Sequence, residues 1–430
     1  MFRSPALLLL LLCTSVLANE RFVVERIDIR GLKFTRQWVV ERELHFSVGD
    51  TITSADIEAA HKRLHNLPAF NDAELTLDSS GVVIVELSEA WPILPVASIS
   101  YTEGDFTDIV NDPGTFFDKV SILAGVRHFN FRGNAEELYA FTQLGSANGF
   151  YVGFRTRWLS SELPYAVRAR VQVLTVTDRH ASVLDSSRDL RSDGISLEAG
   201  TRSGAHRRLG LGLEFQQVEQ EKTWPAEGRT FNTFWVSPYA GLDYRDLEWW
   251  PSRGALTQVR GNFAFGTQDF VRSQYSLAGY FPLKSYFSKA FPHRPPVLAI
   301  QASTAASTTS TPSFAHYYFG FDRSFRGYHG VQTESAGFIV GDAELRFPIT
   351  IESTYNVPYI GRWGKRWPLG LAGVLFAQGG ELRIDRNYTS IFGYGGGIYV
   401  RVPYVQVVEL AVAQNRDGRS EFTINLDVSY

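Results

Sequence analysis

The last nine residues of the chain, Phe422–Tyr430, constrain its fold more than any other segment. Apolar residues occupy every second position of this run, which ends on the aromatic Tyr430, and polar residues occupy the positions between them. A period of two places one row of side chains on each face of a β-strand. A strand with one apolar and one polar face is what a membrane β-barrel requires. The sequence therefore predicts that the chain ends as a barrel strand.

The first residues have the pattern of a secretory signal peptide. Arg3 gives a positive start, Ala6–Leu12 is apolar, and Val16–Ala18 provides a cleavage site. We therefore expect residues 1–18 to be removed. Cys13 is the only cysteine and lies in this segment, so the mature chain can form no disulfide. No later apolar run reaches the ~18 residues that a transmembrane helix needs.

The composition agrees with a barrel and argues against one class of partner. The chain is 14% aromatic, contains 37 glycines and has a mean hydropathy of −0.12. Alternation conceals lipid-facing residues in such averages, and aromatic residues gather at the membrane interfaces of barrels. The net charge of −3 argues against a nucleic-acid partner.

Alternating segments recur from Pro92 to the C-terminus, whereas helical patterns are absent there. Sixteen such segments can be counted, from Val96–Glu103 to Phe422–Tyr430. An even number is typical of a single-chain barrel. A loop rich in serine, threonine and glycine, residues 304–336, precedes the last five segments. We therefore expect residues 92–430 to form a membrane β-barrel of about 16 antiparallel strands.

Residues 20–90 predict a small unit of strands and helices. A strand at Phe22–Ile29 is followed by two helical patterns, the second of which Ser54 can cap at its N-terminus. Two further strands follow, Ala73–Asp78 and Val82–Leu87. This β-α-α-β-β order, together with Ile27–Gly31, resembles a POTRA domain, the periplasmic module of outer-membrane insertases. One such unit fits before the barrel.

Four short motifs of the barrel half occur in an order and spacing that resemble a known family. An Asp-Tyr-Arg-Asp run precedes a Pro-x-x-Gly turn, an Arg-Gly-Tyr tip lies in the long loop, and two strand motifs follow. Behind a POTRA-like unit, these motifs resemble the bacterial surface antigen superfamily, which includes the Bam and Tam insertases and two-partner secretion transporters. The matching stretches are Leu242–Asp246 with Pro251–Gly254, Ser324–Tyr328, Gly341–Pro348, and Leu375–Gly379 with Gly393–Gly397.

The loop tip, formed by Phe325, Arg326, Gly327 and Tyr328, is the first candidate site. The resemblance implies that the loop folds back into the barrel and that Arg326 pairs with acidic residues of the inner wall. A guanidinium cannot lose its charge and therefore needs an acceptor. Glu344 is the predicted partner, because its sequence neighbours would face lipid.

Two further expectations follow from the resemblance. The family often has a second acidic partner where this chain has Gln378, so a neutral hydrogen bond is expected there in place of a salt bridge. The last strand of the family carries a C-terminal insertion signal, which corresponds here to Phe422, Leu426 and Tyr430.

Other polar clusters have structural rather than catalytic interpretations. Asp243, Arg245 and Asp246 are interpreted as a salt-bridge cluster at a hairpin end, beside Trp249–Trp250 as an interfacial aromatic anchor. His61 and His65 lie one helical turn apart, but no third metal ligand is evident, which favours a solvated helix face. The sequence contains no nucleophile elbow, P-loop or dinucleotide fingerprint. We therefore expect no enzyme, no cofactor and no metal site.

The resemblance implies a protein of the bacterial outer membrane with its POTRA-like domain in the periplasm. Its expected function is insertion or translocation of client outer-membrane or secreted proteins through a laterally opening barrel. Expected partners are these clients, outer-membrane lipid and lipopolysaccharide, and other assembly-complex proteins. Two alternatives remain open, namely two-partner secretion of a dedicated exoprotein and a passive or structural pore.

Overall fold

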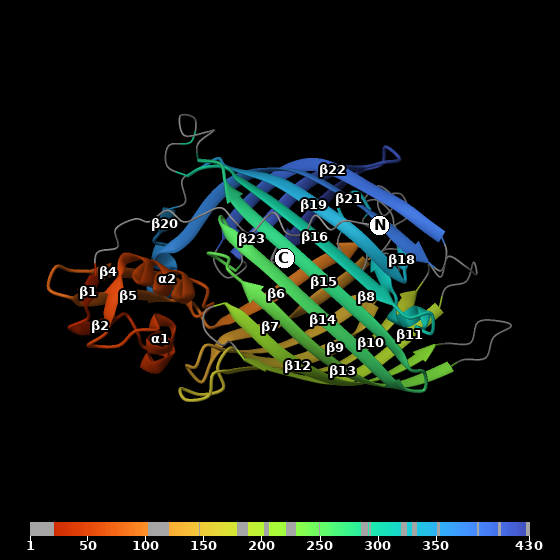
Figure 1. Cartoon of the computed structure of the whole chain (residues 1–430), viewed down its shortest axis with the longest axis horizontal. Coiled ribbons are helices and arrows are strands. Elements are labelled where there is room, and N and C mark those ends of the chain that lie inside the picture. The colour runs from red at the N-terminus through yellow and green to blue at the C-terminus, as the bar shows by residue number, and fades with distance from the viewer. Residues whose placement is uncertain are drawn as a thin grey trace, which may run out of the picture.

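A computed structural model places most of the chain in two parts, a small domain and a barrel. It describes residues 21–101, 120–145, 147–178, 188–201, 206–220, 229–248, 250–284, 291, 294–319, 325–328, 333–350, 353–384, 387–402 and 406–426. The small domain lies at one end of the barrel (Figure 1). The predicted signal peptide, residues 1–18, is outside the described residues.

The small domain has the predicted β-α-α-β-β order with two additional three-residue strands. β5 is the centre of a three-stranded sheet, parallel to β2 and antiparallel to β4, and β1 pairs separately with β3. The elements are β1 (Arg21–Val23), β2 (Arg26–Arg30), α1 (Gln37–Leu44), β3 (Thr51–Thr53), α2 (Ser54–His65), β4 (Phe70–Leu77) and β5 (Val82–Glu89).

The two helices cover one face of this sheet because their apolar residues recur at helical spacing. Val40 and Leu44 of α1 and Leu64 of α2 are buried against Val85 of β5 in one core. The cap of α2 differs from the prediction. Thr53, not Ser54, is the N-cap, and its backbone N–H donates to the Asp56 carboxylate at 2.8 Å in a capping box.

In the part of the chain that the structure describes, sixteen long antiparallel strands form the barrel, as the sequence predicts, and a short seventeenth strand, β20 (Ser353–Tyr355), pairs with the start of β21. β24 and β6 are neighbours and complete the ring. The long strands are β6 (Ile93–Tyr101), β7 (Val120–Phe131), β8 (Glu136–Gly145), β9 (Ala147–Thr156), β10 (Tyr165–Asp178), β11 (Arg188–Thr201), β12 (Arg207–Gln220), β13 (Arg229–Asp243), β14 (Gly254–Gly266), β15 (Phe270–Pro282), β16 (Val297–Ser307), β19 (Gly337–Pro348), β21 (Trp367–Ile384), β22 (Asn387–Val402), β23 (Gln406–Asn415) and β24 (Ser420–Leu426).

The long loop starts later than its composition predicts. β16 continues to Ser307, so residues 304–307 belong to the barrel wall and not to the loop. These serine, threonine and alanine residues pair with β15 and β19, whose hydrogen bonds decide their conformation. The loop itself contains a short helix, η2 (Ser313–Ala315), and a hairpin of β17 (Tyr317–Phe319) and β18 (Thr333–Ser335).

The two faces of the barrel wall differ as the alternation predicts. Large apolar side chains are exposed on the outside, for example Val171, Leu197 and Leu277, each at least 45% exposed. Charged side chains at the alternate positions line the interior. No described helix is long and apolar enough to cross a membrane.

Candidate functional site

The tip of the long loop lies inside the barrel, against the inner wall. Arg326 is only 3% exposed, and its contacts come from β19, β21, β22 and β23. Phe325 and Tyr328 are also buried and belong to one aromatic cluster with Phe319 and Phe338 of β17 and β19. The loop tip is therefore packed within the lumen and does not extend into solvent.

Two carboxylates flank the Arg326 guanidinium. It forms ion pairs with Glu344 of β19 and, at 3.1 Å, with Glu409 of β23. Its plane lies over the ring of Phe376, 4.2 Å from the ring centroid, and one nitrogen lies 3.3 Å from the Tyr399 hydroxyl. A guanidinium suits this position because it remains charged, presents several donors and can stack on an aromatic face. We name Arg326, Glu344 and Glu409 the arginine clamp.

The backbone of the loop tip is bound to the wall as well. The Arg326 N–H donates to the Gln378 amide oxygen at 2.9 Å, and the Gly327 N–H donates to the Glu421 carboxylate at 2.5 Å. Gly327 has a positive φ of 94°. A Cβ added to Gly393 of β22 would lie 2.1 Å from the Arg326 carbonyl oxygen. Glycine at both positions is therefore required by the close approach of loop and wall.

Glu344 connects the arginine clamp to a second arginine. Its other carboxylate oxygen lies 2.7 Å from a guanidinium nitrogen of Arg346, two residues along β19. The Tyr399 hydroxyl donates to Glu344 at 3.1 Å. Glu344 is 2% exposed, so these donors take the place of water around a buried charge.

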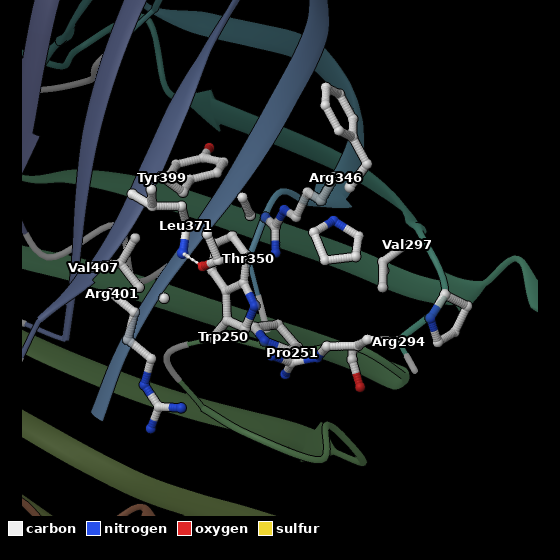
Figure 2. A pocket seen from close by; sticks show the side chains of 16 residues that line it. Trp250, Pro251, Arg294, Val297, Arg346, Thr350, Leu371, Tyr399, Arg401 and Val407 are labelled. Atoms are coloured by element: carbon white, nitrogen blue, oxygen red, sulfur yellow. Dashed lines mark hydrogen bonds between the residues drawn. The ribbon is translucent and has the colours of Figure 1, made fainter. Parts of the chain in front are cut away.

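A turn from the opposite end of the barrel reaches the same group of residues. The turn between β13 and β14, residues 244–253, folds inward, and the Trp250 ring lies edge-on to Tyr399 with centroids 5.0 Å apart (Figure 2). The Arg346 guanidinium lies 4.9 Å from the Trp250 centroid. Trp250 is therefore not the interfacial anchor that the sequence suggested, because it packs inside the barrel mouth. Trp249 is outside the described residues.

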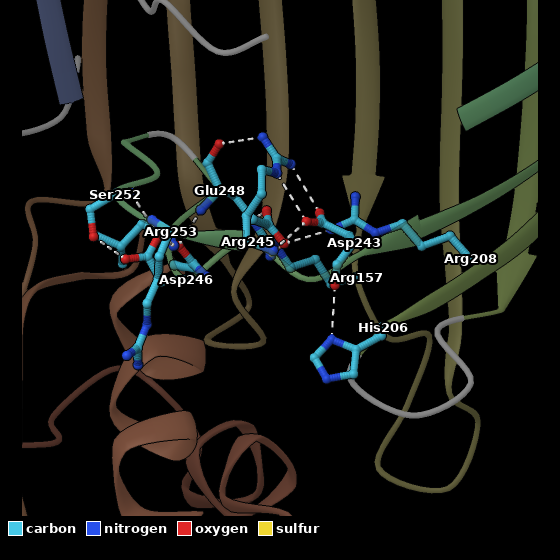
Figure 3. Close-up of polar contacts among 11 residues, drawn as sticks. Arg157, His206, Arg208, Asp243, Arg245, Asp246, Glu248, Ser252 and Arg253 are labelled. Atoms are coloured by element: carbon cyan, nitrogen blue, oxygen red, sulfur yellow. Dashed lines mark hydrogen bonds and ion pairs between the residues drawn. The ribbon is translucent and has the colours of Figure 1, made fainter. Parts of the chain in front are cut away.

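The charged residues of this turn form the salt-bridge cluster that the sequence predicts. Arg245 pairs with Asp243 at 2.9 Å, and Arg208 contacts both Asp243 and Glu248 (Figure 3). Asp246 accepts hydrogen bonds from Ser252 instead of standing beside Asp243 as a second free carboxylate. These partners leave neither aspartate positioned as a general base, so the cluster fixes the shape of the turn.

Three turns bind the small domain to the mouth of the barrel, and in the one between β7 and β8 the Gly133 carbonyl accepts the Arg36 N–H at 2.8 Å. In the turn that holds Trp250, the Glu248 N–H donates to Asn66 at 3.0 Å and Arg253 pairs with Glu58 of α2. In the turn before β21, Arg366 pairs with Asp72 and Glu74, and the Lys365 carbonyl accepts from Ser88. Helix α2 and strand β4 of the small domain therefore have a defined position under the barrel.

His65 lies in this interface and not on a solvated helix face. Its Nε2 lies 2.8 Å from the Arg401 guanidinium of β22, and its Nδ1 lies 3.8 Å from Asp72. Burial, with a contribution from the Arg401 charge, lowers the pKa of His65 to about 3. His61 stacks on His65, and burial lowers its pKa too. Among the described residues, no group of three side chains could hold a metal ion.

The structure brings together some predicted site residues and leaves others apart. Arg326 and Glu344 meet, whereas Gln378 binds the backbone of Arg326 and not its guanidinium. Phe422 is 64% exposed on the outer face of β24. Leu426 is the last residue of β24, and Tyr430 is outside the described residues.

Glu409, Glu421 and Tyr399 contact the loop tip or its partner Glu344 and were not predicted from the sequence, and Glu409 is the one that completes the arginine clamp. The departure at Gln378 suggested that the arginine clamp would lack a second acidic acceptor, and Glu409 corrects this expectation from another strand. A signal was present in the sequence, because Glu409 is a lone acid between the apolar residues Val408 and Leu410. A charged residue at the inward position of an alternating strand indicates a lumen-facing partner.

Comparison with known proteins agrees with this architecture. The model of the Omp85 superfamily domain matches residues 130–423. A comparison with curated proteins found no match.

Several solved structures share the fold. BamA from Haemophilus ducreyi lacking POTRA domains 1–3 aligns with a TM-score of 0.55 and 13% identity, covering 94% of this chain and 83% of BamA. CdiB from Escherichia coli aligns with a TM-score of 0.51 and 11% identity, covering 97% and 92% of the two chains. CdiB from Acinetobacter baumannii aligns with a TM-score of 0.53 and 10% identity, covering 94% and 74%. The chain is thus similar in fold to the BamA and CdiB barrels.

Proposed function

Because the chain belongs to the Omp85 superfamily of outer-membrane barrels, we propose that it inserts client proteins into the outer membrane with the help of its docked small domain. The broader function, insertion or translocation of polypeptides at the outer membrane, is that of the family. The finer assignment rests on three features of this chain, which are the arginine clamp, the free edge of the small sheet and the seam of the barrel.

The arginine clamp is the observation that carries the proposal. A loop held inside the lumen by two buried ion pairs and two backbone hydrogen bonds braces strands β19, β21, β23 and β24 from within. Of these strands, β24 is the neighbour of β6 in the ring, and the other three lie on the same side of the seam where the chain closes on itself. In our proposal, the loop keeps this part of the wall in shape while the seam between β24 and β6 opens.

The small domain offers a place where a client can bind. In the described sheet, β2 is an edge strand that pairs only with β5. The other edge strand, β4, begins beside the barrel turn, where Asn71 donates to the Trp363 carbonyl at 3.1 Å. An extended client segment can add to the exposed edge of β2 through backbone hydrogen bonds. We therefore assign β2 as the first contact with a client in the periplasm.

The seam offers the site of insertion. Opening the pairing between β24 and β6 would expose backbone N–H and C=O groups that lipid cannot satisfy. A client strand can satisfy them by pairing with the open edge. No nucleotide is needed in such a mechanism, because folding of the client supplies the free energy.

Depletion of the protein from its native cell tests the proposal. The abundance of folded outer-membrane barrels, measured by quantitative proteomics of outer-membrane fractions, should fall within a few generations and recover when the wild-type gene is supplied. A chain with Arg326→Ala is the matched comparison and should not restore these levels. Loss of a single secreted protein with unchanged barrel levels would instead assign the chain to secretion. Unchanged levels of both classes would refute a role in protein transport.

A further inference from the structure

A second feature of the lumen lies opposite the arginine clamp. The loop tip packs on the wall formed by β19 and β21–β24, whereas the wall from β7 to β14 lines two cavities of about 390 and 480 Å³. The cavities share Arg155, Arg168, Glu198 and Arg260, so they adjoin each other along the same wall. Their volumes are of the order of those of ligand sites in proteins.

The lining of this space carries an excess of positive charge. Seven arginines and four glutamates line the two cavities, which leaves a formal excess of three positive charges. Several of these charges belong to internal ion pairs. Arg260 pairs with Glu198 at 2.9 Å, and Arg127 and Arg155 share the single carboxylate of Glu137.

Two arginines of β10 have no such partner among the described residues. Arg168 lies directly between Arg155 of β9 and Glu198 of β11, and both of these side chains are paired elsewhere. The cross-strand neighbours of Arg170 are Gly153 and Ser196, which carry no charge, and Arg170 interacts electrostatically, without a direct ion pair, with Glu214 of β12 in the same cavity. In the part of the chain that the structure describes, neither guanidinium forms an ion pair with a carboxylate.

Aromatic side chains separate these positive charges. The rings of Phe141 and Tyr151 are in contact, tilted by 31° with centroids 5.1 Å apart, and adjoin Tyr139. The Arg260 guanidinium lies 4.7 Å from the centroid of Tyr239. The space thus presents guanidinium forks next to aromatic faces and phenol hydroxyls. Guanidinium forks match carboxylates, and aromatic faces accept the apolar parts of a peptide.

We propose that this wall, which we name the β10 basic wall, binds an extended polypeptide segment that carries carboxylate side chains. The proposal rests on the proposed function and extends it, because it adds a contact for the client inside the lumen to the contacts at β2 and at the seam. A single small anion would need one pair of donors. The unpaired cations here lie two residues apart on the same inward face of β10, a spacing that suits alternate acidic residues of an extended chain.

Peptide binding to the purified full chain in detergent micelles tests the proposal. Three fluorescein-labelled ten-residue peptides alternate glycine with glutamate, glutamine or lysine, and binding is followed by fluorescence anisotropy. The glutamate peptide should bind, more weakly as salt is raised, whereas the glutamine and lysine peptides should not. Equal binding of the lysine peptide would overturn the proposal.

Variants on β10 locate the site. Arg168→Gln with Arg170→Gln should weaken binding of the glutamate peptide about tenfold, because two unpaired charges are lost. Arg170→Gln removes the cation that acts on Glu214, but neither change breaks a direct ion pair of a described carboxylate, so the barrel should keep its heat-modifiable folded form. Arg168→Lys with Arg170→Lys keeps the charges and should retain most of the affinity. Arg191→Gln is the matched control, because Arg191 is also on the barrel and pairs with Asp193 outside the cavities.

The remaining outcomes are equally decisive. Unchanged affinity of the double glutamine variant, or the same loss in Arg191→Gln, would overturn the proposal. Inorganic phosphate at the same concentration of charge should not displace the peptide. Displacement would overturn the proposal, since it would show that the site binds single small anions equally well. The assay is independent of client assembly in cells. Peptide binding with unaltered barrel levels after depletion would refute the proposed function and leave the β10 basic wall standing.

Discussion

Arg326 differs from an ordinary surface arginine because its charge is buried between two carboxylates. Breaking a buried pair by removing one partner costs more than the pair itself contributes, since the remaining charge stays desolvated. Here two glutamates would be affected, although Arg346 still pairs with Glu344. Removing Arg326 therefore takes away the 3.1 Å ion pair of Glu409, whereas Glu344 keeps its ion pair with Arg346.

Arg326→Ala should leave the barrel folded and free the loop. The cost of the orphaned acceptors, about 1–3 kcal/mol, is a large part of what holds one loop but little compared with the backbone hydrogen bonds of a barrel. We expect faster cleavage of the loop in limited proteolysis and loss of complementation in the depleted cell. Glu409→Gln in the Arg326→Ala background should restore part of the loop protection. Additive effects of Arg326→Ala and Glu409→Gln would show that the two residues act independently.

Gln378 is a position where added charge should weaken the loop. It accepts the Arg326 N–H and lies directly across from Asp342 on β19. Gln378→Glu places a second carboxylate beside Asp342, and like charges facing each other across strands are destabilising. We expect the loop of this variant to be cleaved faster than that of the wild type. Gln378→Met, which has a similar size and no charge, is the control, and slower cleavage of Gln378→Glu would contradict this argument.

The role of Tyr430 in the insertion of this chain remains a prediction from the sequence. The resemblance to the family implies that the terminal aromatic residue is read when the chain itself is inserted. Deleting Tyr430 should therefore lower the amount of the heat-modifiable form in outer-membrane fractions, whereas Tyr430→Phe should not. Equal amounts of folded protein from the deleted and complete chains would remove this role.

At the scale of elements, the interface between the small domain and the barrel contains a group that can titrate. His65 is buried against Arg401, Asp72 and His61, and its pKa is lowered to about 3 from an ordinary value of 6.5. The docked state therefore favours neutral His65, and the undocked state binds a proton more readily. As the pH falls below about 6.5, docking should weaken progressively until the pH approaches the lowered pKa.

Docking should accordingly be weaker at pH 5 than at pH 7.5, by up to about 2 kcal/mol from His65 alone. The measurement is hydrogen exchange of the α2 and β4 amides in the folded protein at the two pH values, after correction for the intrinsic rates. His65→Gln keeps a hydrogen-bonding side chain that does not titrate. In this variant the protection of the α2 and β4 amides should therefore depend less on pH. The same pH dependence in wild type and variant would assign the effect to other groups.

The turn that carries Trp250 connects these two parts of the molecule. It contacts the small domain through Glu248 and Arg253, and it contacts Arg346 and Tyr399 through the Trp250 ring. Arg346 and Tyr399 both bind Glu344. The docked domain and the arginine clamp are therefore joined by one chain of direct contacts.

At the scale of the whole molecule, the proposed mechanism requires the barrel to open between β24 and β6, and a cross-link between these strands tests that requirement. A disulfide joining the two strands, with cysteines at Ile99 and Leu426 or at neighbouring positions in register, should abolish complementation while the barrel remains folded. Reduction should restore function, and the single cysteine variants are the controls. The mature chain has no cysteine of its own if cleavage follows Ala18. Full activity of the quantitatively cross-linked protein would remove lateral opening from the mechanism.

The sequence by itself determined the local pattern of this protein. Alternation of period two assigned the barrel strands, their number and their lipid-facing sides, because a β-strand places successive side chains on opposite faces whatever its neighbours are. Helical spacing likewise predicted both helices of the small domain. Small residues without an alternating pattern do not mark where a strand ends, and for this reason the sequence places residues 304–307 in the loop while they belong to β16.

Only the tertiary structure decided which inward residues meet. Glu409 joins Arg326 from a strand more than eighty residues away, Trp250 enters the barrel mouth, and His65 faces Arg401 across the domain interface. Each of these contacts depends on the closure of the ring and on how loops and turns fold into it. The alternation along a strand shows that a side chain points inward. The curvature and register of all the other strands determine which residues that side chain contacts.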